Sequence, residues 1–461
     1  MTTIYIGRAM FPHNTELNDS FKAKIAIVGA GIAGLSAAWV LHQKYPITIY
    51  EKNTYVGGHS NTVSVFDKKE SIPVDTGFIV YNELNYPKLT KLFDYLSVET
   101  IESDMSFGFS DRKNNFEYGG HSLNSLFAQR SNFFRPKYWN MISDILRFYR
   151  EAPIDLANGN TDNFSIGDYL HNMNYRNEFI YKHILPMGAA IWSSSISTIT
   201  NCPAQVFIRF FLNHGLLSVR NRPQWRTVKG GSCNYIKQLT KSFSKHVRFS
   251  EVLGVKRDKQ KIFISDQTGN IETFTHVIFA THADTTLGLL SDADDWERKV
   301  FLPWRYSKNL VVLHTDSRLM PRQSRAWSSW NFIGPYGMNN ADKFCVTYWM
   351  NRLQRLATNN QVFITLNPTS HIDPSRILGE YNYDHPILDA AALKTQPCVS
   401  EIQGHKNTWY CGSYLGYGFH EDALQSGLSV ARLLGQLFPP WEEQDDFTSN
   451  RHPMVSELAA E

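Results

Sequence analysis

A glycine-rich turn between a short apolar run and a helical run constrains this chain more than any other feature. Residues 24–28 read KIAIV, which suits a buried parallel strand, and the next six residues match G-x-G-x-x-G. Gly29 allows a tight turn, Gly31 leaves room for a pyrophosphate beside the backbone, and Gly34 lets the helix lie close to the strand. The phosphates would then lie at the free N–H groups of a helix N-terminus. The pattern predicts a dinucleotide-binding unit.

An acidic residue and a second pair of glycines refine this prediction. Glu51 ends the next expected strand, Ile47–Tyr50, about twenty residues after the turn, where it can accept hydrogen bonds from an adenosine ribose. Its charge would repel a 2′-phosphate, which disfavours NADP. Gly57 and Gly58 bring backbone amides to the pyrophosphate at a spacing found in two-dinucleotide flavoproteins, whereas simple NAD dehydrogenases do not need them. The pattern therefore favours FAD over NAD.

The composition is that of a globular protein with an aromatic-rich interior. The 461 residues are 42% hydrophobic and 13% aromatic, and at about 150 residues per domain they predict two or three units. A net charge of +3 is too small to indicate nucleic acid binding. The five cysteines are widely spaced and lack a C-x-x-C motif, so they indicate neither a disulfide framework nor a zinc site. We expect a reducing, cytoplasmic location, no metal and no nucleic acid partner.

The nucleotide-binding signals recur in three separated blocks, which implies one domain interrupted by another. The predicted division is a discontinuous FAD-binding domain at 22–105, 225–300 and 395–437, and a substrate domain at 106–224 and 301–394. The first stretch of the substrate domain looks helical and aromatic, and the second alternates as a sheet does. Residues 1–21 and 438–461 are expected to be flexible tails. The predicted fold class is α/β, with a Rossmann-like FAD-binding domain interleaved with an α+β substrate domain.

These blocks together resemble the flavin-containing amine oxidase superfamily over about residues 22–437. Shorter stretches resemble its bacterial branch of predicted NAD/FAD-binding proteins, which is similar to the N-terminal domain of plant cyclopropane fatty acid synthases. Those stretches are WRTVKGGS at 225–232, LHTD at 313–316, AWSSWN at 326–331 and GYGFHED at 416–422. The resemblance implies an amine oxidase and glutathione reductase type of fold. The association with such synthases suggests an acyl-lipid substrate.

The resemblance also implies where FAD is held. Binding is expected to be non-covalent, because no cysteine stands in the Ser-Gly-Gly-Cys-Tyr context that tethers flavin in monoamine oxidases. Val252 would offer its backbone to the adenine, and residues 412–418 would line the pyrophosphate, the ribityl chain and the flavin edge. His59 and Ser413 depart from the superfamily pattern, which usually has Arg at the first position and an acid or Thr at the second. The predicted cofactor-binding residues are Gly29, Ala30, Gly31, Ile32, Ala33, Gly34, Glu51, Lys52, Gly57, Gly58, His59, Val252, Gly412, Ser413, Gly418, Phe419 and His420.

One lysine is a candidate catalytic residue. Lys308 precedes an apolar strand at 309–314 and aligns loosely with the lysine that holds a water near the flavin N5 in amine oxidases. The alternative is a solvated lysine at the start of a strand. His282 follows the expected strand His276–Ala280, in a turn of the kind that approaches FAD in this superfamily, and the alternative is an ordinary surface histidine.

The loop at 412–418 is followed by an expected helix from Asp422. His420, Glu421 and Asp422 lie where loop becomes helix, and they would either cap the helix or contact flavin or substrate. The resemblance implies that Ser426 and Gly427 open the helix that closes the site.

Two apolar stretches have both a functional and an ordinary interpretation. Residues 126–150 interleave arginine and lysine with aromatic residues, which can dock on an anionic bilayer, here the inner membrane. Alternatively the aromatic residues are core and the basic ones are solvated. The run VFIRFFL at 206–212 is either core or the wall of an acyl tunnel.

The leading functional hypothesis is an FAD-dependent oxidoreductase that oxidises or desaturates a hydrophobic substrate by hydride transfer to flavin N5, with a fatty-acyl lipid as one candidate. One alternative is an amine oxidase that releases an aldehyde and hydrogen peroxide. The other is an FAD-bound accessory protein or non-redox isomerase that acts with a lipid methyltransferase partner.

Overall fold

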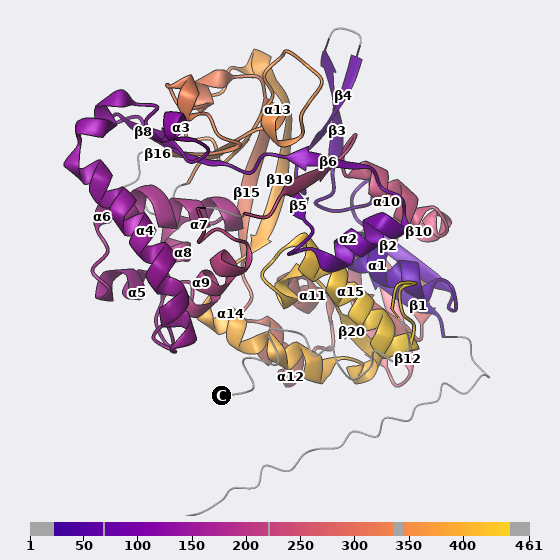
Figure 1. Cartoon of the computed structure of the whole chain (residues 1–461). Coiled ribbons are helices and arrows are strands. Elements are labelled where there is room, and N and C mark those ends of the chain that lie inside the picture. Colours follow the sequence, from indigo (N-terminus) through magenta and orange to yellow (C-terminus); the bar gives the residue numbers. More distant parts are fainter. Residues whose placement is uncertain (1–22, 68–69, 220–221, 335–343, 443–461) are drawn as a thin grey trace, which may run out of the picture.

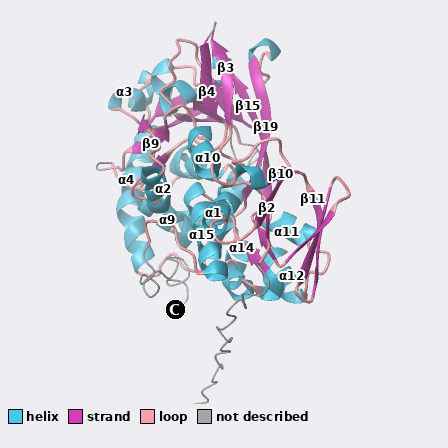
Figure 2. Cartoon of the chain, turned by 90° about the vertical axis from the view of Figure 1, so that its right-hand side faces the viewer, coloured by secondary structure: helices cyan, strands magenta, loops and turns pink. Residues whose placement is uncertain are grey.

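A computed structural model describes residues 23–67, 70–219, 222–334 and 344–442 (Figure 1). Two large sheets organise these residues. In both views the long strands β15 (Tyr306–His314) and β19 (Ile377–Pro386) stand above helices α1 (Ile32–Leu41) and α15 (His420–Gly435) (Figures 1 and 2). The predicted extension at 1–21 and most of the predicted tail at 438–461 lie outside the described residues.

The first sheet is parallel and has the strand order β10-β2-β1-β14-β20. Its strands are β1 (Ile25–Val28), β2 (Ile47–Glu51), β10 (Val247–Phe249), β14 (His276–Phe279) and β20 (Thr408–Tyr410). Strands β1 and β2 are buried throughout, as expected for a parallel sheet covered on both faces. Each of the three predicted nucleotide-binding blocks contributes at least one strand to this sheet.

Helix α1 is enclosed on all sides, because all ten of its residues are buried. It contacts α15 at close range: a Cβ on Gly427 would lie 2.0 Å from the carbonyl oxygen of Ala33 and 2.2 Å from the hydroxyl of Ser36. The Ser36 hydroxyl in turn donates to the carbonyl of Leu424 at 3.1 Å. Helix α15 begins at His420, so Ser426 and Gly427 lie inside it instead of opening it, and this part of the sequence prediction was wrong.

The second sheet has seven strands in the order β19-β15-β18-β17-β16-β7-β8. Its pairs are antiparallel except for β7 with β16. The strands not yet introduced are β7 (Phe107–Asp111), β8 (Phe116–Gly119), β16 (Trp330–Gly334), β17 (Val346–Trp349) and β18 (Phe363–Leu366). The stretch predicted to be helical therefore opens with two strands, which join the sheet formed by residues 306–386.

Helices lie on one side of the seven-stranded sheet (Figure 1). They are α3 (Leu123–Leu126), α4 (Pro136–Ala157), α5 (Ile166–Asn172), α6 (Asn177–Phe179), α7 (Leu185–Trp192), α8 (Ile196–Thr200) and α9 (Ala204–Asn213). Further helices are α2 (Pro87–Tyr95), α10 (Cys233–Thr240), α11 (Ala283–Leu289), α12 (Asp295–Phe301), α13 (Met350–Leu353) and α14 (Ala390–Thr395). None of the helices that the structure describes is both long and apolar enough to pass through a bilayer.

Three small sheets complete the described fold. They are the hairpin β3 (Thr62–Asp67) with β4 (Glu70–Asp75), the set β5 (Tyr81–Asn82), β9 (Trp225–Val228) and β6 (Thr100–Ser103), and the set β11 (Val252–Asp258), β12 (Lys261–Asp266) and β13 (Ile271–Phe274). Strands β10 and β11 follow each other closely in the sequence but belong to different sheets.

The first residues of the predicted C-terminal tail are packed on the protein. The indole of Trp441 stacks on that of Trp39 with 5.6 Å between ring centroids. The carboxylate of Glu442 pairs with Lys88 of α2 and Arg432 of α15. An apolar ring and two basic partners therefore fix residues that their composition alone placed in a flexible tail.

Candidate active site

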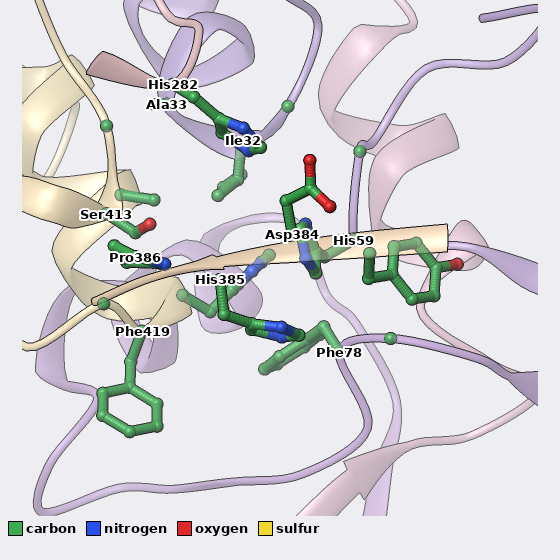
Figure 3. A pocket seen from close by; sticks show the side chains of 18 of the residues that line it. Ile32, Ala33, His59, Phe78, His282, Asp384, His385, Pro386, Ser413 and Phe419 are labelled. Atoms are coloured by element: carbon green, nitrogen blue, oxygen red, sulfur yellow. The ribbon is translucent and has the colours of Figure 1, made fainter. Parts of the chain in front are cut away.

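A cavity of about 470 Å³ extends from the parallel sheet to the seven-stranded sheet. At one end it is lined by residues after β1 and β2, including Gly29, Gly31 and Glu51. At the other end it is lined by strand residues such as Val311 and Ile364. The first end lies at the carboxyl edge of the parallel strands, where open α/β sheets bind their ligands. Figure 3 shows part of the wall between the two ends.

The three glycines of the turn have three different environments. Gly29 has φ +105°, which side chains rarely adopt, and a Cβ there would lie 2.7 Å from the carbonyl oxygen of Ala280. A Cβ on Gly34 would lie 2.0 Å from the carbonyl oxygen of Gly29, so this glycine lets α1 pack closely. A Cβ on Gly31 would meet nothing within 4 Å, and this residue lines the cavity. Of the three, only Gly31 has a side-chain position that opens onto empty space.

Glu51 holds the turn in place. Its buried carboxylate accepts the backbone N–H of Ala30 at 2.9 Å and that of Asn53 at 2.8 Å. It also lines the cavity. The acid thus combines a structural role, which the sequence did not reveal, with an accessible position beside the ligand space.

The glycine pair at 57–58 packs against the glycine turn that follows β1. Gly57 and Gly58 both have positive φ, at +116° and +59°. The N–H of Gly57 donates to the carbonyl of Ala30 at 2.7 Å, and a Cβ on Gly58 would lie 3.2 Å from the Cα of Gly31. Both predicted glycine motifs therefore form one continuous backbone wall of the cavity.

The loop at 412–420 forms the opposite wall. Gly412, Ser413, Gly418, Phe419 and His420 all line the cavity. The Gly412 N–H donates to the hydroxyl of Ser426 in α15 at 2.9 Å. This contact ties the loop to the helix, although Ser426 does not open that helix.

The two acids after His420 stabilise the structure around the loop. Asp422 accepts the backbone N–H groups of Tyr417 at 3.1 Å and Phe419 at 2.8 Å. Glu421 accepts those of Lys88 and Leu89 in the first turn of α2, at 2.7 and 2.9 Å. Burial raises the pKa of each carboxyl to about 7. Neither acid lines the cavity, so the capping interpretation fits them, and His420 alone of the three reaches the ligand space.

Five histidines line the cavity: His59, His214, His282, His385 and His420. The rings of His59 and His385 are 5.2 Å apart, and that of Tyr383 is 4.9 Å from His59. Figure 3 shows Asp384, His385 and Pro386 along β19, with His59 and Phe78 beside them. Sequence reasoning selected His59 and His420 and weighed His282, but it missed His385, which no motif marks.

Burial keeps these histidines neutral. It lowers the pKa of His59 to about 4, with a further lowering by His282, and it lowers the pKa of His420 to about 3. The pKa of His385 falls to about 3 through burial and through its neighbours His59 and His282. The His420 Nε2 bonds to the hydroxyl of Tyr235 at 2.6 Å, and Tyr235 bonds to Ser60 at 2.7 Å. The cavity therefore offers neutral imidazoles, which can accept a proton.

Lys308 is not among the residues that line the cavity. It is the third residue of β15, its side chain is exposed, and its register partner on β19 is Asp384. The strand begins earlier than expected, at Tyr306, whose side chain does line the cavity. The predicted catalytic position is therefore exposed and is not part of the cavity lining, although its register partner Asp384 is, and the interpretation as a solvated lysine fits the structure.

The end of the cavity beneath the seven-stranded sheet is apolar. Its lining residues there are Met105, Ile191, Val311, Trp330, Tyr348, Ile364 and Leu366. From α9, Phe210 lines the cavity, whereas Phe207 and Phe211 are core residues and Leu212 is exposed. The run at 206–212 is therefore mostly core, as its ordinary interpretation holds, and contributes one residue to the wall.

Among the lining residues, buried polar atoms without a hydrogen-bond partner in the described part of the chain include His59 Nε2, Trp330 Nε1 and the Tyr414 hydroxyl. Buried polar groups are nearly always paired. Together with the open space beside Gly31, these atoms fit a cavity built around a ligand that carries polar groups. Of the remaining predicted contacts, Ile32, Ala33, Lys52 and Val252 also line the cavity, whereas Ala30 and Gly34 do not.

Comparisons of the sequence with known proteins give matches over short parts of the chain. Residues 27–96 match the family model of the NAD(P)-binding Rossmann-like domain. Over 55 residues, 12% of the chain, it is 46% identical to 4,4′-diapophytoene desaturase of Staphylococcus aureus, and over 75 residues, 16% of the chain, it is 36% identical to zeta-carotene desaturase of Capsicum annuum. These matches span 10% and 12% of the two relatives, so the chain covers only about a tenth of their length.

Solved structures match nearly the whole chain. A putrescine oxidase variant has a TM-score of 0.65 at 13% identity and covers 89% of this chain and 98% of its own. Cyclohexylamine oxidase from Brevibacterium oxydans has a TM-score of 0.62 at 12% identity and covers 90% and 99%. A fatty acid isomerase from P. acnes has a TM-score of 0.58 at 16% identity and covers 89% and 99%. The predicted fold class is confirmed: the chain has a mixed α/β fold with a Rossmann-like domain, and it shares this fold with the putrescine oxidase and cyclohexylamine oxidase structures.

Proposed function

We propose that the chain binds FAD non-covalently and is an oxidoreductase that oxidises or desaturates a hydrophobic substrate, with a fatty-acyl lipid as the candidate class. One observation carries the proposal. A single cavity joins the glycine turn at the nucleotide edge of the parallel sheet to an apolar end beneath the seven-stranded sheet. Such a cavity presents a glycine-rich backbone wall to a dinucleotide at one end and an apolar lining to an uncharged chain at the other.

The residues at the nucleotide end fit FAD. Gly31 and the pair Gly57–Gly58 would hold the pyrophosphate, Glu51 the adenosine ribose, and Val252 the adenine. The loop at 412–420 would hold the flavin end. When bound, the flavin supplies an acceptor for a hydride equivalent.

The apolar end favours a hydrophobic substrate over an amine. The charged residues that line the described part of the cavity are Glu51, Lys52, Glu251 and Asp384. None of them is among the seven residues named above that form the apolar end. A cationic amine would lose its hydration there without gaining a counter-charge. The two relatives are named as desaturases of the carotene type, and one similar structure is named as a fatty acid isomerase. These names also support a hydrophobic substrate.

The histidines suit the proton that a desaturation releases. Removing two hydrogens from adjacent carbons yields one hydride equivalent and one proton. The neutral His59 ring has an unpaired Nε2 that lines the cavity, so it can take up a proton without first breaking a hydrogen bond. The ring of His385 lies 5.2 Å away between centroids, and a positive charge on His59 lowers the pKa of His385, so only one of the two rings would carry the proton.

The experiment has two steps. Heat or acid treatment of the purified protein is expected to release FAD. Anaerobic mixing with membrane lipids, and separately with amines, then tests for bleaching of the flavin absorbance. Bleaching by an acyl lipid, with a new double bond found by mass spectrometry, supports the proposal. A Gly31→Val variant, which should carry no FAD, is the control for reaction by contaminants.

The other outcomes identify the alternatives. Bleaching by amines alone, with peroxide formed on adding oxygen, means an amine oxidase and contradicts the proposed substrate class. A shifted double bond without net flavin reduction means a non-redox isomerase, which the similarity to the fatty acid isomerase favours as the second candidate. No change with any lipid or amine supports an accessory role beside a lipid methyltransferase.

A further inference from the structure

Aromatic and aliphatic side chains gather on the outside of the helical region. The aromatic patch, as we name it, consists of Leu123, Phe127, Phe133, Phe134 and Trp139. Phe134 is 83% exposed, Leu123 78%, Phe133 55% and Trp139 44%. The ring of Phe133 lies within 5.7 Å of the rings of Phe127, Phe134 and Trp139, between centroids. Contiguous exposed apolar groups of this kind mark interaction sites more often than single ones do.

The patch is narrower than the stretch 126–150 that the sequence singles out. Tyr138 and Phe148 are fully buried and belong to the core, as the ordinary interpretation of that stretch holds, whereas Leu146 is 53% exposed. The exposed residues come from α3, a 3₁₀ turn at Arg130–Phe134 and the first turn of α4. These elements lie next to one another at one corner of the molecule, around the label α3 in Figure 1.

Hydrogen bonds hold the patch in shape. The indole N–H of Trp139 donates to the carbonyl of Phe133 at 2.8 Å, and the hydroxyl of Tyr138 donates to the carbonyl of Leu126. The guanidinium of Arg130 donates to the carbonyl of Phe127 at 3.0 Å. The apolar rings are therefore presented on a braced surface, which lowers the entropy lost when they are buried by a partner.

The charges around the patch are positive. Arg130 bonds to the side-chain oxygen of Asn124 at 2.6 Å, and Arg135 bonds to the carbonyl of Asn115 at 2.9 Å. Both acceptors are neutral, and within the described ranges no acid forms an ion pair with either arginine. Lys137 has a side chain that is 80% exposed, and it faces Glu178 at 3.6 Å.

We propose that the aromatic patch docks on an anionic phospholipid surface. Phe133, Phe134 and Leu123 would enter the headgroup and acyl boundary, while Arg130 and Arg135 would contact lipid phosphates. A second copy of the chain is the less suitable occupant. A two-fold contact would place the same patch against itself and bring the uncompensated arginines together. The proposal does not depend on the proposed catalytic function.

The test is flotation of the full-length protein with phosphatidylcholine vesicles, with and without added phosphatidylglycerol. We expect binding to the anionic vesicles, reduced by added salt. The double variant Phe133→Ser/Phe134→Ser is expected to bind at least about tenfold more weakly. The double variant Arg130→Gln/Arg135→Gln is expected to lose about fivefold per arginine on anionic vesicles only. Phe249→Ser in β10, whose side chain is 55% exposed on another part of the molecule, is the matched control.

Two results would overturn the proposal. One is equal binding of the wild type, the phenylalanine variant and Phe249→Ser to anionic vesicles. The other is a dimer in sedimentation experiments that the phenylalanine substitutions abolish, without any binding to vesicles. Thermal unfolding checks that each variant is folded. If the double variant is not, Phe134→Ser alone keeps the test decisive, because this side chain is 83% exposed.

Discussion

The Glu51 carboxylate accepts the backbone N–H of Ala30 at 2.9 Å, and so ties the end of β2 to the turn that follows β1. Its other oxygen accepts the N–H of Asn53 at 2.8 Å. The acid that would bind the ribose therefore also shapes the wall against which the pyrophosphate would lie. Binding and stability are coupled at this one side chain.

Glu51→Ala is expected to weaken both FAD binding and the apoprotein. Losing a charged acceptor should reduce FAD affinity about 10- to 150-fold. The two backbone N–H groups that lose their partner should reduce the free energy of unfolding by about 1–3 kcal/mol. Fluorescence titration with FAD and urea unfolding of the apoprotein measure the two effects. Glu99→Ala, at a side chain 69% exposed and paired with Lys229, is the control. Unchanged FAD affinity would mean that the adenosine binds elsewhere.

Two glycine substitutions should separate binding from folding. A Cβ on Gly31 meets nothing within 4 Å, and its φ of −73° suits a branched residue, so Gly31→Val should fold normally but lose FAD. A Cβ on Gly34 would lie 2.0 Å from a backbone oxygen, so Gly34→Ala should cost about 1–3 kcal/mol of stability. Absorbance of bound flavin and thermal unfolding distinguish them. A yellow Gly31→Val protein would contradict the proposed site.

The nucleotide end was predictable because its residues are close in sequence. The turn, β1, α1 and β2 lie within one short stretch, and local rules assign each glycine and the acid a role. His385 was not predictable, because its position depends on how β19 pairs with β15, as in the pair Ser307 with His385, which are 78 positions apart in the sequence. Long-range strand pairing carries no local signature.

Lys308→Met is expected to have little effect. The side chain is exposed and does not line the cavity, so its removal should leave flavin reduction and reoxidation within about twofold and change stability by less than about 0.5 kcal/mol. Stopped-flow absorbance of the two half-reactions gives the comparison with wild type. A tenfold slowing of either half-reaction, at unchanged FAD content, would show that the lysine reaches the flavin in the loaded protein.

The cavity histidines should make the protein sensitive to acid. Burial and the neighbouring His59 and His282 lower the pKa of His385 to about 3 from an ordinary value of 6.5. Below pH 6.5 the unfolded chain therefore binds a proton that the folded chain does not. The contribution of His385 to the free energy of unfolding is fully present above this pH and is lost as the pH falls toward 3. His385→Gln should reduce the slope of unfolding free energy against pH in this window by up to about 1.4 kcal/mol per pH unit, which is one proton.

Urea unfolding of the apoprotein at a series of pH values measures this slope. His371→Gln, at an exposed position outside the cavity lining, should leave the slope unchanged. Because His59 and His420 have lowered pKa values for the same reason, the His385→Gln protein should still lose stability in acid, only less steeply. Equal slopes for wild type and His385→Gln would show that the imidazole titrates freely in the folded chain. The buried position of His385 beside His59 would then not hold in solution.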